Sequence, residues 1–499
     1  MGILFAVGGV GSVIAGCVAA AIFLAVGEGA ADVFVQPGSR LASAAATGAF
    51  VVGIPALWIG LATYVVPLQI GGHRLAMPRL HNLALWLFAA GGMLVTIGAV
   101  ADNRTLSSLA ASRPATATLG ANPTNATELF LAGLVIVGVA TLLAALSLLT
   151  TILNRRGEGV RLLHVPAFTW GAIGTSVTLL LSTPVFIGGL VLLFFDQHYG
   201  GTLFAGGAGI GGVRIWEHEL WLLGRPEALV FWGATIGIYC DVVATALRRP
   251  LVGWPIAQAA SAAAPLLTLG AYIGATSVLS SPFAPIATIG AALFLVGPAL
   301  AVLTFLASGR GSRPRLLPGL IPLFAHFALD GLLIAAYAAG LFGDVIGEEA
   351  AAFRNGQLVL ISLAQPLIGL AAGLLHWAPK LRGSVASLPS AGLATLLILG
   401  GAVLLAAPGY IVGLGGSDDT SVIGAIGAAV LAVGLLSLLP TLVGPAGSSP
   451  GDPYEGLTLE WATASPPVRH NFEEVPEIRS AYPLHDARVA AAAPEGEAD

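Results

Sequence analysis

The chain has 499 residues, of which 56% are hydrophobic and only 9% are charged, and its formal net charge is −5. A soluble globular domain carries roughly 25% charged residues, so this chain has too few charges to cover a soluble surface. It also has no block of basic residues, which argues against nucleic acid as a partner. The composition therefore predicts a protein whose solvent is a lipid bilayer.

Apolar stretches long enough to cross a bilayer recur along most of the chain. A hydrocarbon core of about 30 Å needs roughly 20 apolar residues in a helix, and a helix satisfies its own backbone hydrogen bonds at that depth. About twelve such stretches are present. They are residues 3–27, 43–69, 81–101, 127–153, 165–195, 226–247, 257–279, 284–307, 318–342, 356–377, 388–409 and 421–444. We expect an all-α polytopic membrane bundle.

The distribution of positive charge predicts how this bundle is oriented. Fifteen of the 21 Lys and Arg residues fall in one alternate set of connections and in the C-terminal segment. Cytoplasmic connections are enriched in Lys and Arg, so both termini are expected in the cytoplasm. After residue 446 the composition changes to Gly, Pro, Ser and charged residues, without a further spanning stretch. We expect a transmembrane bundle over residues 1–446 and a cytoplasmic tail over residues 447–499.

Four separated blocks of sequence resemble one known family. In chain order they read PALWIGLATYVVPLQIGGHRLAMPRLHN (55–82), WEHELWLLGRPE (216–227), HWAPKLRG (376–383) and DPYEGLTLEWATASPPVRHNFEEVPEIRS (452–480). They are similar to the second helix and its following loop, the start of the sixth helix, the end of the tenth helix and the tail of haem-copper oxidase subunit I. This family provides the catalytic chain of cytochrome c oxidase. The resemblance implies a twelve-helix membrane fold, with the lipid bilayer and other subunits of a respiratory oxidase or supercomplex as partners. The excess of Arg over the single Lys380 indicates a bacterial genome, so we expect the bacterial plasma membrane.

The resemblance also implies where metal ligands should lie. In that family two imidazoles hold a low-spin haem, one holds a high-spin haem and three hold a copper ion. The matching haem positions are Ala44, Gln357 and Val359, and the matching copper positions are Arg225, Ala275 and Thr276. None is histidine, and no histidine occurs in residues 1–72 or 219–325. We therefore expect neither haem nor copper.

Some ionisable residues inside the predicted spans remain candidates for proton transfer. An acidic residue in a bilayer is costly, which makes it a functional candidate. Glu227 matches the glutamate that passes protons onward in the resembling family; the alternative is a neutral or Arg-paired remnant. His326 and Asp330 are four residues apart, so they share one helical face and form either a relay or an internal hydrogen bond.

Other polar residues have structural interpretations. Within the block at 216–227, Glu217, Trp221 and Arg225 are structural candidates, and Arg225 is expected to pair with Glu217 or Glu227. Asp241, seven residues before Arg248, is expected to reach or pair at the cytoplasmic interface. Four further residues lie near predicted cytoplasmic ends and are expected to be interface histidines: His73, His81, His164 and His376.

Three functions follow from these observations. The first is a cofactor-free accessory, structural or assembly subunit of a respiratory membrane complex. The second is a catalytic terminal oxidase subunit, which transfers electrons to oxygen and pumps protons through a non-standard ligand set. The third is a proton or ion pathway without redox chemistry that uses Glu227, His326 and Asp330. Whether the chain is an enzyme stays open, and the missing histidines favour the answer that it is not.

Overall fold

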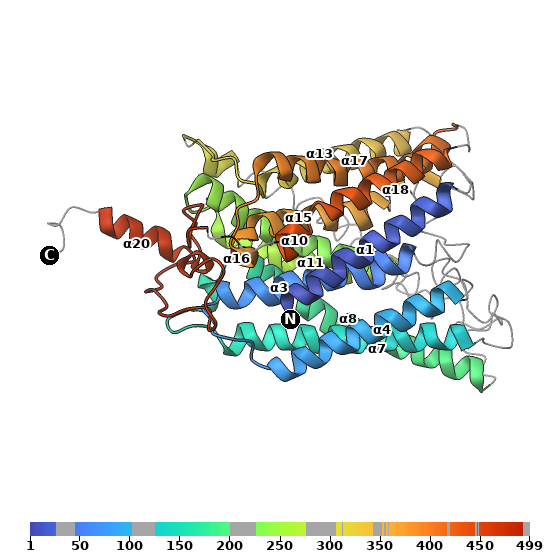
Figure 1. Cartoon of the computed structure of the whole chain (residues 1–499), viewed down its shortest axis with the longest axis horizontal. Coiled ribbons are helices and arrows are strands. Elements are labelled where there is room, and N and C mark those ends of the chain that lie inside the picture. Colours follow the sequence, from blue (N-terminus) through green and yellow to red (C-terminus); the bar gives the residue numbers. More distant parts are fainter. Residues whose placement is uncertain are drawn as a thin grey trace.

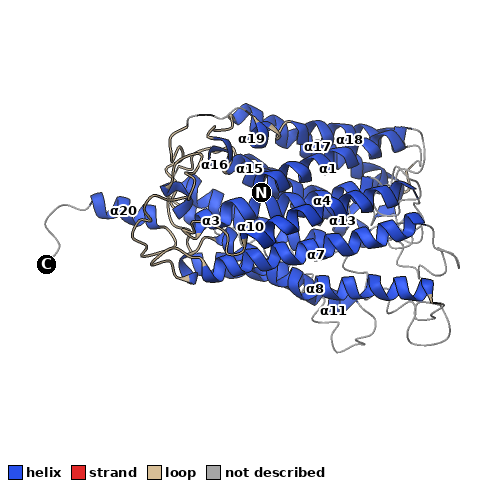
Figure 2. Ribbon diagram, turned by 60° about the horizontal axis from the view of Figure 1, so that its bottom comes forward, coloured by secondary structure: helices blue, strands red, loops and turns tan. Residues whose placement is uncertain are grey.

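A computed structural model describes residues 1–25, 45–101, 125–199, 226–275, 306–311, 313–342, 352–353, 356–357, 359–416, 420–444, 447 and 449–492. Throughout these residues the regular structure is helical, and no strand occurs among them (Figure 2). The long helices run side by side, and the described C-terminal residues gather at one end of the bundle (Figure 1). The expected all-α class is therefore confirmed for the part of the chain that is described.

The long helices begin and end close to the predicted stretches. They are α1 (Gly2–Ala25), α3 (Ile54–Gln69), α4 (Pro78–Ala101), α7 (Asn125–Asn154), α8 (Ala167–His198), α10 (Pro226–Leu247), α11 (Trp254–Ala275), α13 (Leu320–Phe342), α15 (Gln365–His376), α17 (Leu388–Gly413) and α18 (Ser421–Leu436). Within the described residues, seven helical spans are long and apolar enough to cross a membrane. The expected span at 284–307 lies mainly outside the described residues.

Short helices join the long ones near the end that carries the tail. They are α16 (Ala378–Arg382), α19 (Pro440–Val443), α20 (Pro483–Ala492) and two 3₁₀ turns at Leu162–His164 and Leu459–Ala462. Around the second turn the tail packs against the bundle: Leu457, Leu459, Trp461 and Phe472 are all buried. Burial of these apolar side chains holds the tail at the end of the bundle.

Glycine at helix contacts explains how the bundle packs so closely. A Cβ atom on Gly9 of α1 would lie 2.5 Å from the backbone nitrogen of Leu57 in α3. Likewise, a Cβ on Gly401 of α17 would lie 2.4 Å from the backbone nitrogen of Leu431 in α18. Such distances are below any real Cβ contact, so only glycine permits these backbones to approach. The large glycine content of the sequence therefore serves helix association.

Candidate functional site

Two of the six expected ligand positions have described side chains. Val359 is buried and offers only hydrocarbon, and Gln357 is half-buried and offers an amide. Neither supplies the imidazole nitrogen that the resemblance requires. The other expected site residues have side chains outside the described residues: Ala44, Glu217, Trp221, Arg225, Glu227, Ala275 and Thr276.

Both described segments next to expected haem positions begin with π-helical turns. One turn covers Thr47–Gly53 before α3, and the other covers Leu360–Ala364 before α15. A proline at the start of each following helix, Pro55 and Pro366, cannot donate a backbone hydrogen bond to the preceding turn. π-helical turns are frequent at functional sites, and here they widen the backbone at the start of both helices.

The interior between α3, α10 and α15 is filled by side chains. Trp58 and Phe231 are fully buried, with ring centroids 5.5 Å apart. A Cβ on Gly369 would lie 2.3 Å from Cγ2 of Thr235, and one on Gly373 would lie 2.7 Å from Cδ2 of Leu61. In the described part of the chain, no group of three or more His, Cys, Asp or Glu residues is arranged to hold a metal ion.

A buried polar cluster joins α10, α13 and α15, and it contains two of the expected proton-transfer residues. The ring nitrogens of His326 bridge two partners: Nδ1 lies 2.7 Å from the Tyr239 hydroxyl, and Nε2 lies 3.8 Å from Oδ2 of Asp330. The amide Nε2 of Gln365 donates a hydrogen bond to Oδ1 of Asp330. We call these four residues the Tyr239 cluster.

Only one of the two contacts of His326 is at hydrogen-bond distance: its Nδ1 lies 2.7 Å from the Tyr239 hydroxyl, whereas the 3.8 Å between Nε2 and Oδ2 of Asp330 is too long for a hydrogen bond. If Nδ1 accepts from the hydroxyl, Nε2 carries the proton and faces Asp330, and a proton transfer to Asp330 requires the two side chains to move closer. The four-residue spacing indicated the pair of His326 and Asp330, but it did not indicate Tyr239 or Gln365. Both come from other helices, and their only signal in the sequence is polarity within apolar stretches.

A second buried cluster, the Gln69 cluster, lies where α3 ends. Nε2 of Gln69 donates to Oδ2 of Asp241 at 2.8 Å and to Oε1 of Glu460 at 3.2 Å. Its Oε1 accepts from the hydroxyl of Thr169 at 2.8 Å. The side-chain amide thus connects three helical segments and the tail through both of its ends.

Asp241 has a different role from the one expected. Its carboxylate accepts the backbone N–H groups of Ala167 and Phe168, both at 3.2 Å, which are the first two residues of α8. The residue is buried and does not pair with Arg248, which contacts Glu455 of the tail instead. Because an acidic group at a helix N-terminus satisfies free N–H groups and the helix dipole, Asp241 caps α8 from a neighbouring helix.

Glu460 brings a buried carboxyl group from the tail to the bundle. Besides Gln69, the indole Nε1 of Trp377 donates to its Oε1 at 3.3 Å, and Oε2 has no hydrogen-bond partner among the described residues. Burial raises the pKa of Glu460, and the hydrogen bonds from Gln69 and Trp377 oppose that rise. Glu460 therefore holds its proton to a higher pH than an exposed glutamate does.

The side chain of Lys380 in α16 holds the tail by binding backbone carbonyl groups of the tail. Its ammonium group donates to the carbonyl oxygens of Gly451, Thr463 and Ala464 at 2.8, 2.6 and 3.4 Å. It also lies 5.1 Å from the ring centroid of Trp461. Burial lowers the pKa of Lys380 to about 8, against the opposing effect of nearby acidic groups. One side chain thus binds three points of the tail.

The four expected interface histidines divide into two kinds. His73 is exposed and His164 is half-buried. His81 and His376 are fully buried instead. Nε2 of His81 lies 2.9 Å from the Thr63 hydroxyl, and the His376 ring stacks on Tyr454. The sequence places these two near helix ends but does not show that neighbouring helices and the tail cover them.

Comparisons with known proteins agree on one family. The family model described as "Cytochrome C and Quinol oxidase polypeptide I" matches residues 2–346. Cytochrome c oxidase subunit 1 of Thermostichus vulcanus is 28% identical, over 85% of this chain and 79% of the relative. A putative cytochrome c oxidase subunit 1-beta of Streptomyces coelicolor is 29% identical, over 86% of this chain and 78% of the relative.

A solved structure supports the fold independently. It is a heme-copper terminal oxidase dimer, which matches with a TM-score of 0.58 at 13% identity, over 90% of this chain and 85% of the other. This likeness extends along nearly the whole chain. It shows that the helices are arranged as in that protein.

The comparisons contradict the prediction that the chain takes neither haem nor copper. The relatives are cytochrome c oxidase subunit 1 proteins and the structural neighbour is a heme-copper terminal oxidase, and such proteins carry haem and copper. The prediction was drawn from six matched positions, whereas a ligand is defined by where its donor atom lies in space. Gln357 and Val359 themselves do not fit as haem ligands, so ligands would have to come from other residues.

Proposed function

Because this chain belongs to the family of cytochrome c and quinol oxidase polypeptide I, we propose that it is an accessory, structural or assembly subunit of a respiratory oxidase complex. Its partners are the other subunits of that complex, and its surroundings are the lipid of a bacterial plasma membrane. The family membership supports the respiratory oxidase complex as the place where the chain acts. The role within the complex is inferred from what the buried polar groups do.

The observation that carries the proposal is that these groups connect parts of the chain. Asp241 caps α8, Gln69 joins Asp241 to Glu460, and Lys380 binds three carbonyls of the tail. Buried polar groups of this kind stabilise one arrangement of segments, because each would be costly without its partners. A tail that is held against the end of the bundle by these contacts suits a subunit that positions its neighbours.

The proposal also includes the number of spans, the orientation in the membrane and the bounds of the bundle and the tail. We infer about twelve spans, with both termini in the cytoplasm, a bundle over residues 1–446 and a tail over residues 447–499. A described helix lies in each expected stretch except 284–307, which is mainly outside the described residues. In the sequence, most of the Arg residues fall in one alternate set of connections and in the tail, which the positive-inside rule assigns to the cytoplasmic side.

Purification from native membranes tests the role. A chain tagged at its C-terminus should copurify with a separate subunit I that has all six histidines, and deletion of the chain should lower the amount of that assembled complex. The control is a tagged unrelated membrane protein from the same membranes. The proposal is refuted if the chain, expressed alone with ample haem and copper, reduces oxygen and contains both metals in stoichiometric amounts.

That refuting outcome describes the second candidate, a catalytic terminal oxidase subunit. The observation in its favour is that relatives matched over most of this chain are named as cytochrome c oxidase subunit 1. Oxygen consumption by the purified chain with a reduced electron donor distinguishes the two functions. Turnover by the chain without another subunit I supports the oxidase, and no turnover in a sample that still copurifies with the complex supports the accessory role.

The third candidate, a proton pathway without redox chemistry, is favoured by the Tyr239 cluster. Tyr239, His326 and Asp330 form a chain of groups that can each exchange a proton. Glu227 is the remaining member proposed for this path. In proteoliposomes, Asp330→Asn should abolish proton flux, whereas Thr96→Val, on the α4 helix, should leave it unchanged. Equal flux in all three proteins excludes this candidate.

A further inference from the structure

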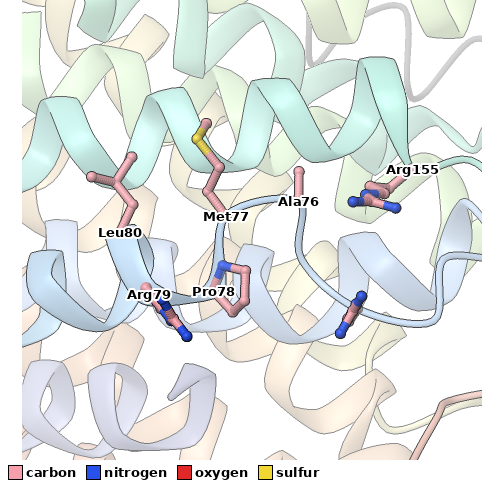
Figure 3. A pocket seen from close by; sticks show the side chains of 7 residues that line it. Ala76, Met77, Pro78, Arg79, Leu80 and Arg155 are labelled. Carbon is pink, nitrogen blue, oxygen red and sulfur yellow. The ribbon is translucent and has the colours of Figure 1, made fainter.

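A cavity of about 420 Å³ opens between the start of α4 and the end of α7. It is lined by three arginines, Arg74, Arg79 and Arg155, and by apolar side chains that include Met77, Pro78 and Leu80. Figure 3 shows Pro78 between the labelled side chains of Arg79 and Arg155. The cavity lies at the tail end of the molecule, because Asn471 of the tail donates to the carbonyl of Gly72 in the same loop.

The three arginines of this cavity carry uncompensated charge. All three are exposed, and none forms an ion pair with a described carboxylate. The adjacent Arg156 differs, since its guanidinium donates to the carbonyls of Ile152 and Val160. The cavity also adjoins the N-terminus of α4, a 24-residue helix whose dipole adds positive potential there. The site is therefore suited to an anion.

The surface beside the cavity is hydrocarbon. Along α4, Leu83 and Trp86 follow Arg79 by four and seven residues, so they lie on the same helical face, and both are exposed. On α7, Leu146 and Leu153 are also exposed. Trp is typical of the boundary between headgroups and acyl chains, and Trp86 is 66% exposed there. An occupant of the cavity thus lies beside three arginine side chains and is flanked by exposed apolar side chains of α4 and α7.

We propose that this cavity binds the phosphodiester headgroup of an anionic phospholipid, whose acyl chains lie along the exposed faces of α4 and α7. A guanidinium group binds a phosphate oxygen pair through parallel hydrogen bonds, and basic pockets between membrane helices on the cytoplasmic side suit anionic headgroups. A free phosphate ion would use the arginines but would leave the exposed apolar side chains uncovered. These apolar side chains therefore favour a lipid over a soluble anion.

Lipid titration of the purified full-length chain tests the proposal. The chain in neutral detergent is titrated with phosphatidylglycerol or phosphatidylcholine, and bound lipid is counted by native mass spectrometry. We expect phosphatidylglycerol to bind more tightly than phosphatidylcholine. Each arginine near a membrane surface contributes enough that Arg79→Gln should weaken binding about fivefold, and replacement of all three by Gln roughly a hundredfold.

Arg313 provides the matched control, because it is exposed, lies outside the cavity and has no described ion pair. Arg313→Gln should leave the affinity for phosphatidylglycerol unchanged. Inorganic phosphate at millimolar concentration separates the sources of the anion: it should not displace the lipid. The proposal is overturned if the triple variant binds phosphatidylglycerol as well as the unmodified chain, if Arg313→Gln weakens binding equally, or if inorganic phosphate displaces the lipid completely.

Discussion

Replacing Lys380 by Met separates the charge of this side chain from its bulk. The two side chains have similar length, so Lys380→Met keeps most of the packing and removes the donor. The carbonyl of Gly451 retains a second partner, the hydroxyl of Ser465 at 2.7 Å. The carbonyls of Thr463 and Ala464 lose the donor that Lys380 provides. The variant therefore removes one hydrogen bond from each of the three tail carbonyls, of which Gly451 alone keeps the side-chain donor Ser465.

The magnitude follows from the carbonyls of Thr463 and Ala464 and from the indole ring. An unsatisfied buried group costs about 1–3 kcal/mol, and an ammonium over a ring contributes about 0.5–2 kcal/mol. Burial of the lysine charge offsets part of this, because the pKa falls from 10.5 to about 8. One pKa unit corresponds to about 1.4 kcal/mol, so we expect a net destabilisation of about 1–3 kcal/mol at pH 7.

The dependence on pH has a definite sign. The folded chain releases the Lys380 proton near pH 8 and the unfolded chain near pH 10.5. Between these values the unfolded state binds more protons, so the stability of the unmodified chain rises with pH. Lys380→Met does not titrate there. The stability difference between the two proteins should therefore widen as the pH rises from 8 to 10 and stay constant below 8.

Thermal unfolding in a neutral detergent at several pH values measures this difference. Arg313→Met, at an exposed position without an ion pair, is the control and should unfold like the unmodified chain at every pH. Limited proteolysis reports on the tail directly, because Lys380→Met should expose residues 449–482 to cleavage first. A stability difference that narrows above pH 8, or no difference at pH 7, would refute the reasoning.

Three further substitutions test the packing and the buried acids by thermal unfolding. Gly369→Ala places a methyl group 2.3 Å from Cγ2 of Thr235 and should destabilise by about 1–3 kcal/mol, whereas Gly400→Ala meets nothing within 4 Å and should not. Asp241→Ala removes the cap of α8 and should cost about 0.5–2 kcal/mol; unchanged stability would contradict that role. Glu460→Gln removes a carboxyl group whose pKa is raised by burial, so the unmodified chain should lose stability relative to this variant as the pH rises above 4.5; a gain would contradict the shift.

Local properties of the sequence determined the class of this protein. Hydropathy over about 20 residues is a property of neighbouring residues, and it predicted an all-α membrane protein without reference to any long-range contact. The spacing of His326 and Asp330 predicted their contact for the same reason, since a helix places residues four apart on one face. The four sequence blocks indicated the family that the comparisons then showed.

The partners of the buried polar groups were decided only by the tertiary structure. Gln69 contacts Glu460 across 391 positions of sequence, and Tyr239 contacts His326 across 87, so no local pattern contains either pair. Asp241 was expected at an interface because its neighbours in sequence are basic, yet α8 presents two free N–H groups to it. Burial makes such partners decisive, because a polar group removed from water is stable only where another segment brings it a hydrogen bond.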